Sequence, residues 1–311
     1  NYAANYKPLP DGYDDEVQSI FANVELGWRS QLYLTLTGRN DWDSKLAFSN
    51  QSSYFYPSVG LSAVLTEMFA LPKIISYAKV RGSYTVVASS FDRYLTNPGY
   101  EYNSQTHNWA NPTVYPMDNL KPEKTKSWEI GLNLKFWENR FNLDATYYRS
   151  NTLNQTFKVD IPSSSGYNKA IVQTGNVQNQ GFEVSLGWYN QFTDNFSWST
   201  NFNFSYNNNK IIELADELSE WNLTSYCTGA KVLLKEGGHF GDLYVRDLQR
   251  DDNGKPIVSD TGAPVLAGSD NKDLVYAGDM NAKVNMGWTN TFHYKDFTLS
   301  FLIDAKVGGK V

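Results

Sequence analysis

Apolar and polar residues alternate along most of this chain. Alternation with a period of two is typical of β-strands whose two faces meet different surroundings. Helical periodicity is nearly absent, and only 65–73 and 211–221 are candidates for short helices. The pattern therefore predicts an all-β fold. The predicted strands lie near residues 16–28, 31–40, 54–66, 75–86, 125–137, 141–150, 180–190, 196–207, 282–292 and 297–306.

The connections between these strands alternate in length. In an antiparallel up-and-down sheet every second connection lies at the same end, so all the short turns should fall at one end and all the long loops at the other. Short periplasmic turns and long extracellular loops are typical of outer-membrane β-barrels. The short connections are 29–30, 67–74, 138–140, 191–195 and 293–296, and the long ones are 41–53, 87–124, 151–179 and 208–281.

The two phases of the alternation differ in chemistry. One phase is apolar and uncharged, as in Val24, Leu26 and Trp28, whereas the other is rich in Ser, Thr, Asn and Gly. A charge at the bilayer midplane costs a barrel about 2–4 kcal/mol, which explains an uncharged lipid-facing phase. We expect an antiparallel up-and-down transmembrane β-barrel wall. The alternative is a soluble, aromatic-rich β-sandwich that binds carbohydrate, with the apolar phase as its core.

Aromatic residues gather around the short turns. Tyr and Trp rings are favoured at the membrane–water interface, where an apolar body and a polar tip are both satisfied. We therefore expect one membrane-interface girdle on the periplasmic side. Its predicted members are Trp28, Phe136, Phe141, Trp188, Phe196, Trp288 and Phe297.

Composition narrows the function. The net charge of −6, with acidic and basic residues mixed along the 311 residues, argues against a nucleic-acid partner. The three histidines are dispersed, so we expect no metal site and no cofactor. The acidic segment 251–264 contains Asn253-Gly254, a strong signal for a tight turn rather than for a calcium loop. No spacing suggests a catalytic triad or a carboxylate pair, so the sequence does not predict an enzyme.

Two further groups of residues are candidates for binding. Exposed aromatic rings stack on sugars and also dominate protein interfaces, so the long loops offer Trp109, Tyr115 and Trp221 as ligand-binding candidates. Packing within the loops or against a partner protein is the alternative for these rings. On the polar phase, Glu25, Arg81, Glu129 and Glu183 are candidates to face the lumen or a plug, or to sit in a wet lumen without a specific role.

Several stretches resemble one protein family in consistent order. The segment LKPEKTKSWEIGLNLKFWENRFNLDATYYRSNT (120–152) resembles a barrel segment of the SusC/RagA-type TonB-dependent transporters of Bacteroidota. SSYFYPSVGLSAVLTE (52–67), AKVRGSYTVVAS (78–89) and GNVQNQGFEVSLGW (175–188) are similar to other strands of that family, with Thr85 where a Gly is usual. KEGGHFGDLYV (235–245) and MNAKVNMGWTNTFHYKDFTLSFLIDAKVGGK (280–310) extend the resemblance over most of the chain.

The resemblance implies a barrel of roughly 22 strands closed around a plug. Residues 1–311 would be a partial barrel domain of middle-to-late strands, without the plug or the last strands. It also implies an outer-membrane importer of oligosaccharides or peptides, partnered by a SusD-like lipoprotein, by outer-membrane lipid and, through an absent N-terminal part, by the TonB complex. About ten strands would leave two open edges, which lipid cannot satisfy.

Overall fold

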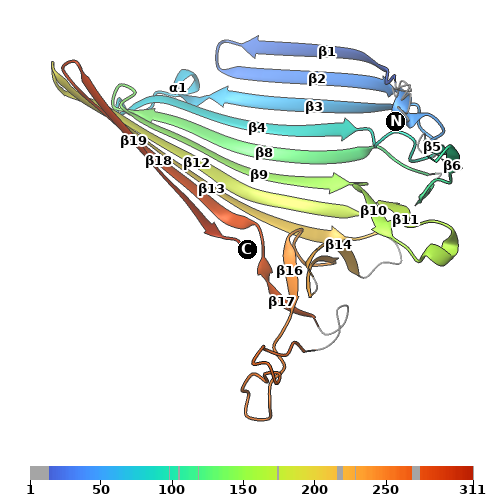
Figure 1. Cartoon of the computed structure of the whole chain (residues 1–311). Coiled ribbons are helices and arrows are strands. Elements are labelled where there is room, and N and C mark those ends of the chain that lie inside the picture. The colour runs from blue at the N-terminus through green and yellow to red at the C-terminus, as the bar shows by residue number, and fades with distance from the viewer. Residues whose placement is uncertain are drawn as a thin grey trace, which may run out of the picture.

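A computed structural model describes residues 14–97, 99–103, 106–117, 119–173, 175–215, 220–227, 229–267 and 274–310. Its main feature is one large, curved antiparallel sheet of ten strands, which we term the main sheet (Figure 1). In spatial order the strands are β1 (Val17–Trp28), β2 (Leu32–Asp43), β3 (Ser53–Val64), β4 (Ile75–Ser89), β8 (Glu123–Phe136), β9 (Phe141–Leu153), β12 (Asn176–Thr193), β13 (Phe196–Glu213), β18 (Ala282–Tyr294) and β19 (Phe297–Gly308).

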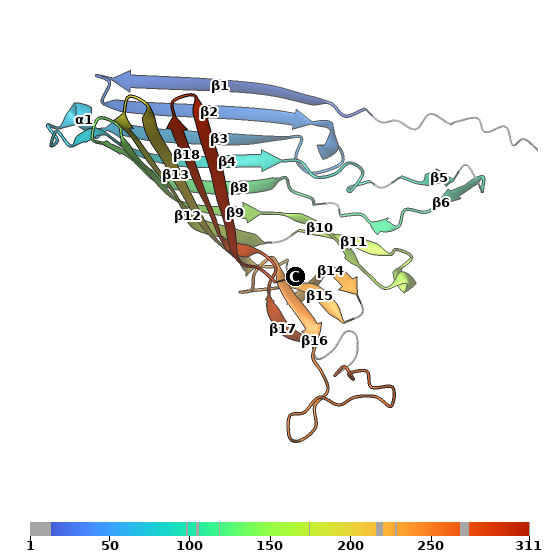
Figure 2. The same ribbon diagram turned by 60° about the vertical axis from the view of Figure 1, so that its left-hand side comes forward.

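The main sheet confirms the predicted strands and the sorting of their connections. Each strand pairs with the next long strand of the chain, so the topology is up-and-down throughout. Figures 1 and 2 show the five short connections at one end of the sheet, and the loops with their additional strands at the other. We refer to these as the turn end and the loop end.

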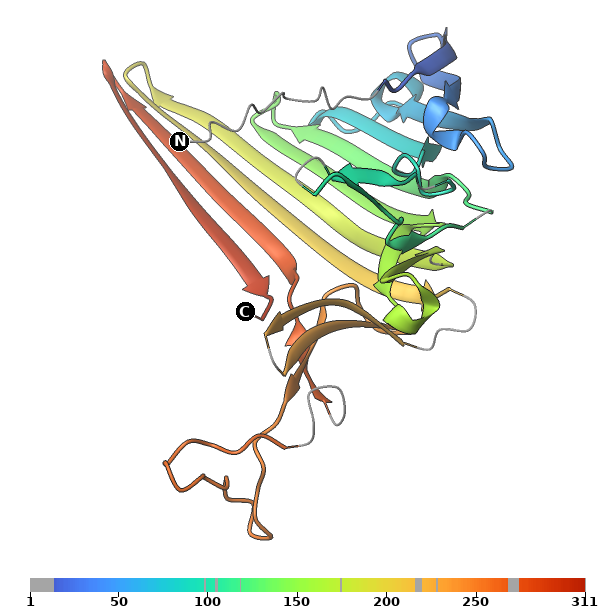
Figure 3. The ribbon, with the colours of Figure 1, turned by 45° about the vertical axis from the view of Figure 1, so that its right-hand side comes forward.

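The long loops contain strands that the sequence pattern did not predict. Figure 3 shows these small sheets gathered at the loop end. They comprise a two-stranded sheet of β5 (Glu101–Asn103) and β6 (Asn108–Ala110), a three-stranded sheet of β7 (Val114–Tyr115), β10 (Thr156–Asp160) and β11 (Lys169–Gln173), and a four-stranded sheet of β14 (Glu220–Cys227), β15 (Ala230–Lys235), β16 (Asp242–Arg246) and β17 (Leu274–Asp279).

Helices are short. The candidate at 65–73 forms only one turn, α1 (Leu65–Met68), and two 3-10 turns occur at η1 (Ser44–Leu46) and η2 (Ser163–Ser165). The candidate at 211–221 is wrong at its described ends, because β13 continues to Glu213 and β14 begins at Glu220. Ile211 and Ile212 are strand positions of β13 and Trp221 is one of β14, and a helical spacing can imitate such positions over a few residues. No helix in the described part of the chain is long and apolar enough to cross a membrane.

The predicted turn at Asn253-Gly254 is confirmed. The Gly254 amide donates to the carbonyl of Asp251 at 2.9 Å, with Gly254 at a φ of +79°. The Asp251 carboxylate accepts from the backbone amides of Asn253 and Lys255 at 2.9 and 2.8 Å. Asp251 thus stabilises the turn by local hydrogen bonds, which is how Asp commonly acts in turns.

The register keeps the two phases on separate faces across the whole sheet. One row of directly paired residues is apolar in all ten strands: Trp28, Leu32, Ala63, Val80, Leu132, Ala145, Val184, Phe204, Met286 and Ala305. The adjacent row on the opposite face is Gly27, Tyr33, Ser62, Arg81, Gly131, Thr146, Glu183, Ser205, Asn285 and Lys306. The main sheet therefore has one apolar face and one polar face.

The register is also sheared in the manner of a barrel. The row through Trp28, the last residue of β1, crosses β8 at Leu132, four residues before that strand ends at Phe136. The same row crosses β19 at Ala305, eight residues from its first residue, Phe297. Strands in a barrel are tilted and staggered in this progressive way. The main sheet is therefore a curved wall rather than one layer of a sandwich.

Two edges of this wall are open. All twelve residues of β1 are exposed, and within the described part of the chain β1 and β19 each pair on one side only. The packed interior lies instead at the loop end, in two clusters. One contains Leu46, Tyr54, Ala88, Phe91, Leu95, Leu120 and Ile171, and the other contains Val177, Ile211, Leu214, Trp221 and Leu234.

Candidate functional site

The polar face holds a charged network at mid-height. Arg81 on β4 reaches across β8 to Asp144 on β9, with Nη1 donating to Oδ2 at 3.0 Å and Nη2 to Oδ1 at 2.8 Å. Nη2 also donates to Thr146 Oγ1 at 2.6 Å, and Asn133 Nδ2 donates to Asp144 Oδ2 at 2.8 Å. A forked arginine–carboxylate pair of this kind is geometrically specific. It links three consecutive strands of the main sheet on its polar face.

Gly131 makes this network possible. It lies between Arg81 and Thr146 in the same row of β4, β8 and β9. A Cβ at this position would lie 2.5 Å from Arg81 Nε and 2.9 Å from its Cγ. The arginine side chain therefore lies directly over the Gly131 backbone, and close approach rather than a turn explains the glycine.

The network borders a hollow of about 600 Å³ on the polar face. Side chains from six strands line it, which shows that this face is concave. They include Arg81, Asp144, Glu183, Asn203, Asn285 and Asp304. Arg81 is already paired with Asp144, so Glu183 and Asp304 give the hollow an acidic excess.

A second hollow, of about 640 Å³, adjoins the first at Asn285 and lies toward the loop end. Its wall is rich in amides. Asn207 and Asn209 on β13 both donate to Asn179 Oδ1 on β12, at 3.2 and 3.0 Å, and Tyr148 donates to Asn207 Oδ1 at 3.2 Å. The Oε1 atom of Gln155, which also lines this hollow, is buried and has no hydrogen-bond partner among the described residues. Lys283, Lys306 and Asp279 also line this hollow, and its amides suit ligands with many hydroxyl or amide groups.

The sequence pattern did not identify this amide group. Asn207 and Asn209 lie in the run of three asparagines that follows Tyr206, and alternation along β13 sends these two to the polar face and Asn208 to the other. An asparagine run at a strand end can equally be an ordinary loop signal. The pairing of β12 with β13, which brings Asn179 beside them, was needed to recognise the site.

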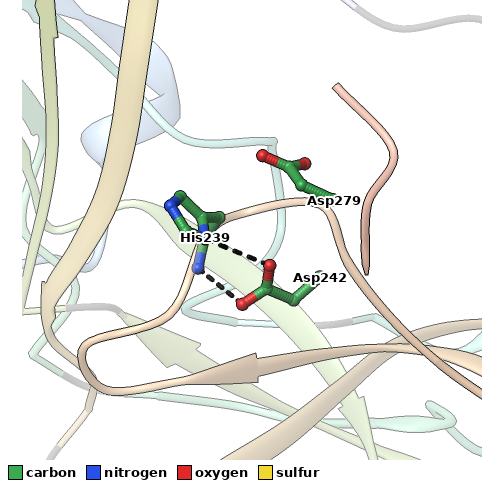
Figure 4. A group of neighbouring side chains, drawn as sticks. All are labelled: His239, Asp242 and Asp279. Atoms are coloured by element: carbon green, nitrogen blue, oxygen red, sulfur yellow. Dashed lines mark hydrogen bonds and ion pairs between the residues drawn. The ribbon is translucent and has the colours of Figure 1, made fainter. Parts of the chain in front are cut away.

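Beside the second hollow, His239, Asp242 and Asp279 place one potential ligand atom each within 4.8 Å of one another (Figure 4). Their hydrogen bonds, however, are made within the protein. The His239 backbone amide and Nδ1 contact Asp242 at 2.8 and 3.2 Å, and Lys283 Nζ lies 3.4 Å from His239 Nε2. Lys283 thus contacts the imidazole nitrogen of His239 that Asp242 does not. The group thus ties the loop before β16 to strand β18.

Asp242 also acts on Tyr276, which lies on the neighbouring strand β17. Burial raises the pKa of Tyr276, and the charge of Asp242 and a hydrogen bond to it raise it further. Asp242, only 4% exposed, is therefore the centre of a structural network at the base of the four-stranded sheet.

The lumen-facing candidates all lie on the polar face, but only some come together. Arg81 and Glu183 line the same hollow. Glu129 is near enough to Arg81 to act on it electrostatically. Glu25 lies in the same row as Glu129 but is separated from it by three strands, on the open edge strand β1.

The three loop aromatics have different surroundings. Trp109 is 68% exposed and its ring lies 5.1 Å from that of Tyr102, whereas Tyr115 is 54% exposed and meets Tyr167 edge-on at 5.2 Å. Trp221 is only 7% exposed and packs edge-on against Phe157 at 4.7 Å. The expectation of an exposed ring is therefore wrong for Trp221, because the four-stranded sheet folds back onto β12 and β13 and buries it.

Six of the seven girdle candidates lie toward the turn end of their strands, and some of them touch, whereas Trp288 is the middle residue of β18, six residues before Tyr294. Phe136 and Phe141 lie 5.8 Å apart, and Phe141 and Trp188 lie 6.4 Å apart. Trp137, in the turn between Phe136 and Phe141, has its ring 5.9 Å from that of Trp188. Trp28, Phe196, Trp288 and Phe297 belong to the other hairpins of the same end.

A second aromatic group, which the sequence pattern did not single out, lies about midway along its strands on the apolar face, closer to the loop end than Phe136 and Phe141 are. The rings of Trp128 and Tyr147 are 5.3 Å apart, and those of Phe182 and Tyr206 are 5.5 Å apart. Tyr147, Phe182 and Tyr206 occupy one register row across β9, β12 and β13. We term these four residues the upper aromatic row.

Comparison with known proteins identifies the family. The family model described as TonB dependent receptor-like, beta-barrel matches residues 1–301. TonB-dependent receptor P3 of Formosa agariphila is 28% identical over 97% of this chain and 33% of its own length. TonB-dependent receptor SusC of Bacteroides thetaiotaomicron is 26% identical over 94% of this chain and 31% of its own length.

Solved structures show the same fold. The RagAB peptide importer in its closed-closed state matches with a TM-score of 0.78 and 19% sequence identity, over 94% of this chain and 33% of that chain. The chain thus spans about a third of the length of these relatives. The sheared, two-faced sheet and the match over residues 1–301 together show that the chain belongs to the TonB-dependent receptor-like β-barrel family and forms part of the wall of an outer-membrane barrel.

Proposed function

We propose that the full-length protein is a TonB-dependent active importer of oligosaccharides or peptides that works with a SusD-like surface lipoprotein. In this proposal the apolar face meets lipid, the polar face lines the lumen, and the loop end is extracellular. The TonB complex would act through a part of the protein outside this chain. The proposed function is transport, and it includes no chemical conversion of the substrate.

One observation carries the proposal furthest: the two adjoining hollows form a continuous polar track along the lumenal face. The amide-lined hollow lies toward the loops and the acidic hollow lies at mid-height. Asparagine side chains both donate and accept, as the hydroxyls of sugars and the amides of peptides require. A substrate rich in hydroxyl or amide groups therefore finds suitable hydrogen-bond partners at the point where it would enter the barrel.

The exposed loop aromatics are consistent with the same route. Trp109 and Tyr115 lie at the loop end, where a substrate or a lipoprotein lid would first make contact. Flat rings stack on sugars and anchor protein interfaces alike. Six of the girdle candidates, Trp28, Phe136, Phe141, Trp188, Phe196 and Phe297, would mark the periplasmic membrane interface, in agreement with the proposed orientation.

The test replaces asparagines of the track in the full-length protein. Asn207→Ala combined with Asn209→Ala removes two lumenal amides, while Asn208→Ala removes the outward-facing amide between them. Uptake of labelled oligosaccharide and peptide libraries by whole cells is then measured, with surface abundance checked by immunoblot. Loss of two substrate hydrogen bonds should lower uptake roughly tenfold or more.

The Asn208→Ala variant should import at close to the parental rate. A protonophore should stop uptake by the parent and by this variant. The class of library that depends on the asparagine pair would name the substrate. Uptake of both libraries that is indifferent to the asparagine pair, or that continues without a proton-motive force, would contradict the proposal.

A further inference from the structure

The apolar face of the main sheet changes character abruptly near the loop end. The row Ile130, Tyr147, Phe182, Tyr206 is apolar and aromatic. Two rows further toward the loops, the same four strands present Lys126, Asn151, Gln178 and Lys210 on the same face. The change occurs at one level on four neighbouring strands, so it marks a boundary.

Basic residues dominate the surface beyond this boundary. Lys124 and Lys126 project from β8, Arg149 from β9 and Lys210 from β13. We term these four residues the basic patch. Lys126, Arg149 and Lys210 are exposed. An acidic residue, Glu213, ends β13 three residues beyond Lys210, and its side chain lies against Gly175, just before the first residue of β12.

The positive charges of the basic patch are not neutralised within the described part of the chain. No carboxylate among the described residues forms an ion pair with Lys124, Lys126 or Lys210. Arg149 is held by a neutral group instead. When the side-chain oxygen and nitrogen of Gln178 are exchanged, which satisfies the hydrogen bonds of both atoms, the oxygen accepts from Arg149 Nη2 at 2.7 Å and from Arg149 Nε at 2.9 Å. The guanidinium is thus fixed in place while its charge remains available.

The level of the patch corresponds to that of lipid headgroups. Trp128 of the upper aromatic row and Phe136 at the turn end are eight residues apart on β8, which is about 27 Å along a strand and about 20 Å along the membrane normal for a strand tilted by about 40°. The apolar band of outer-membrane barrels is about 25 Å tall and is flanked by aromatic rows. The basic patch therefore lies just outside the apolar band, on the surface that faces lipid.

We propose that the basic patch binds the phosphate of a lipid headgroup in the outer leaflet of the outer membrane. Lys126 and Lys210 are separated by three strand spacings, about 14 Å, with Arg149 between them one row nearer the apolar band. This width suits a phosphorylated glycolipid headgroup, whose acyl chains would lie on the upper aromatic row. The proposal rests on the outer-membrane location of the barrel and not on what it imports.

The experiment uses the full-length protein in detergent, titrated with monophosphoryl lipid A and followed by native mass spectrometry. Lys126→Gln combined with Lys210→Gln removes two exposed charges that have no ion-pair partner among the described residues, so folding should be unaffected. Each basic residue near a membrane surface changes binding by about fivefold, so the affinity should fall roughly 10- to 30-fold. Adding Arg149→Gln should weaken binding further.

Two controls isolate the charge and its position. Lys79→Gln combined with Lys135→Gln removes the same charge from the polar face and should leave the affinity within about twofold of the parent. Dephosphorylated lipid A should bind the parent no better than monophosphoryl lipid A binds the double variant. Equal affinity of the parent for the two lipids, or equal affinity of parent and Lys126/Lys210 variant for monophosphoryl lipid A, would overturn the proposal.

Discussion

At the scale of single residues, the polar face depends on a glycine as much as on charges. Arg81 reaches Asp144 only because Gly131 presents no side chain beneath its path. The glycine in the segment Glu129-Ile130-Gly131 is therefore a packing requirement of an arginine on the neighbouring strand. A glycine at this position could be explained by strand curvature alone, but Gly131 makes room for one specific side chain, that of Arg81.

Replacing Gly131 with alanine should separate Arg81 from Asp144. The added methyl group would lie 2.5 Å from Nε, so the side chain must swing away and give up its forked hydrogen bonds. Because both partners are more than a third exposed, the loss should be modest, about 1 kcal/mol of unfolding free energy. Chemical denaturation of the full-length barrel measures it.

Gly60→Ala is the matched control, since a Cβ there would meet nothing closer than 3.9 Å. It should change the unfolding free energy by less than about 0.5 kcal/mol. Equal stability of the two variants would show that Arg81 keeps its contact by another path.

At the scale of elements, the long loops are folded structures rather than open chain. The four-stranded sheet β14–β17 rests on the loop ends of β12 and β13 through the cluster of Val177, Ile211, Trp221 and Leu234. The His239–Asp242 contact and Lys283 fasten the same sheet to β18. Apolar burial and a buried carboxylate thus hold one loop in a defined position over the polar face.

Trp221→Ala should loosen this attachment. Truncating a buried tryptophan costs about 3–5 kcal/mol through lost burial and the cavity left behind. The effect should be local, so we expect faster amide hydrogen exchange in β14–β16 and little change in β2–β4. Exchange followed by mass spectrometry on the full-length protein checks this.

Trp109→Ala removes a ring that is 68% exposed and should leave exchange in β14–β16 unchanged. Similar protection in the Trp221 variant and the parent would mean that the sheet is held by its other contacts. The pair of variants also separates a packing tryptophan from one that is free to contact a ligand.

At the scale of the whole molecule, the main sheet is a curved wall with two chemically different faces and two open edges. Each backbone group on an open edge needs a partner inside a bilayer, because lipid offers none. Further strands beyond β1 and β19 would satisfy them, and the relatives that match this chain are about three times its length. The two faces assign lipid to one side of the wall and the lumen to the other.

Arginine substitutions on adjacent residues test this assignment. Val184 lies in the uncharged row of the apolar face, and Ser185 lies on the polar face opposite Asp144. Val184→Arg should destabilise insertion by about 2–4 kcal/mol, whereas Ser185→Arg should be tolerated. Folding of the full-length variants into lipid vesicles, followed by heat-modifiable gel mobility, measures the difference. If Ser185→Arg destabilised insertion more than Val184→Arg did, the face that holds Ser185 would be the one that meets lipid, and the assignment would be wrong.

The sequence by itself determined the strands, their two faces and the sorting of turns and loops. These features are local: alternation with period two can be read along each strand, and a lipid-facing row excludes charge wherever it occurs. The placement of Trp28, Phe136 and Trp188 near short turns follows from the same reading. Strand ends were less exact, as β12 and β13 run several residues beyond their predicted limits.

Only the tertiary structure decided which distant residues meet. The burial of Trp221, the passage of Arg81 over Gly131, the amide group of Asn179 with Asn207, and the basic patch all depend on strand register or on how a loop folds back. Register joins residues tens of positions apart, and a shift of one residue would send each side chain to the opposite face. Such contacts arise from packing of the whole sheet, which no short stretch of the chain encodes.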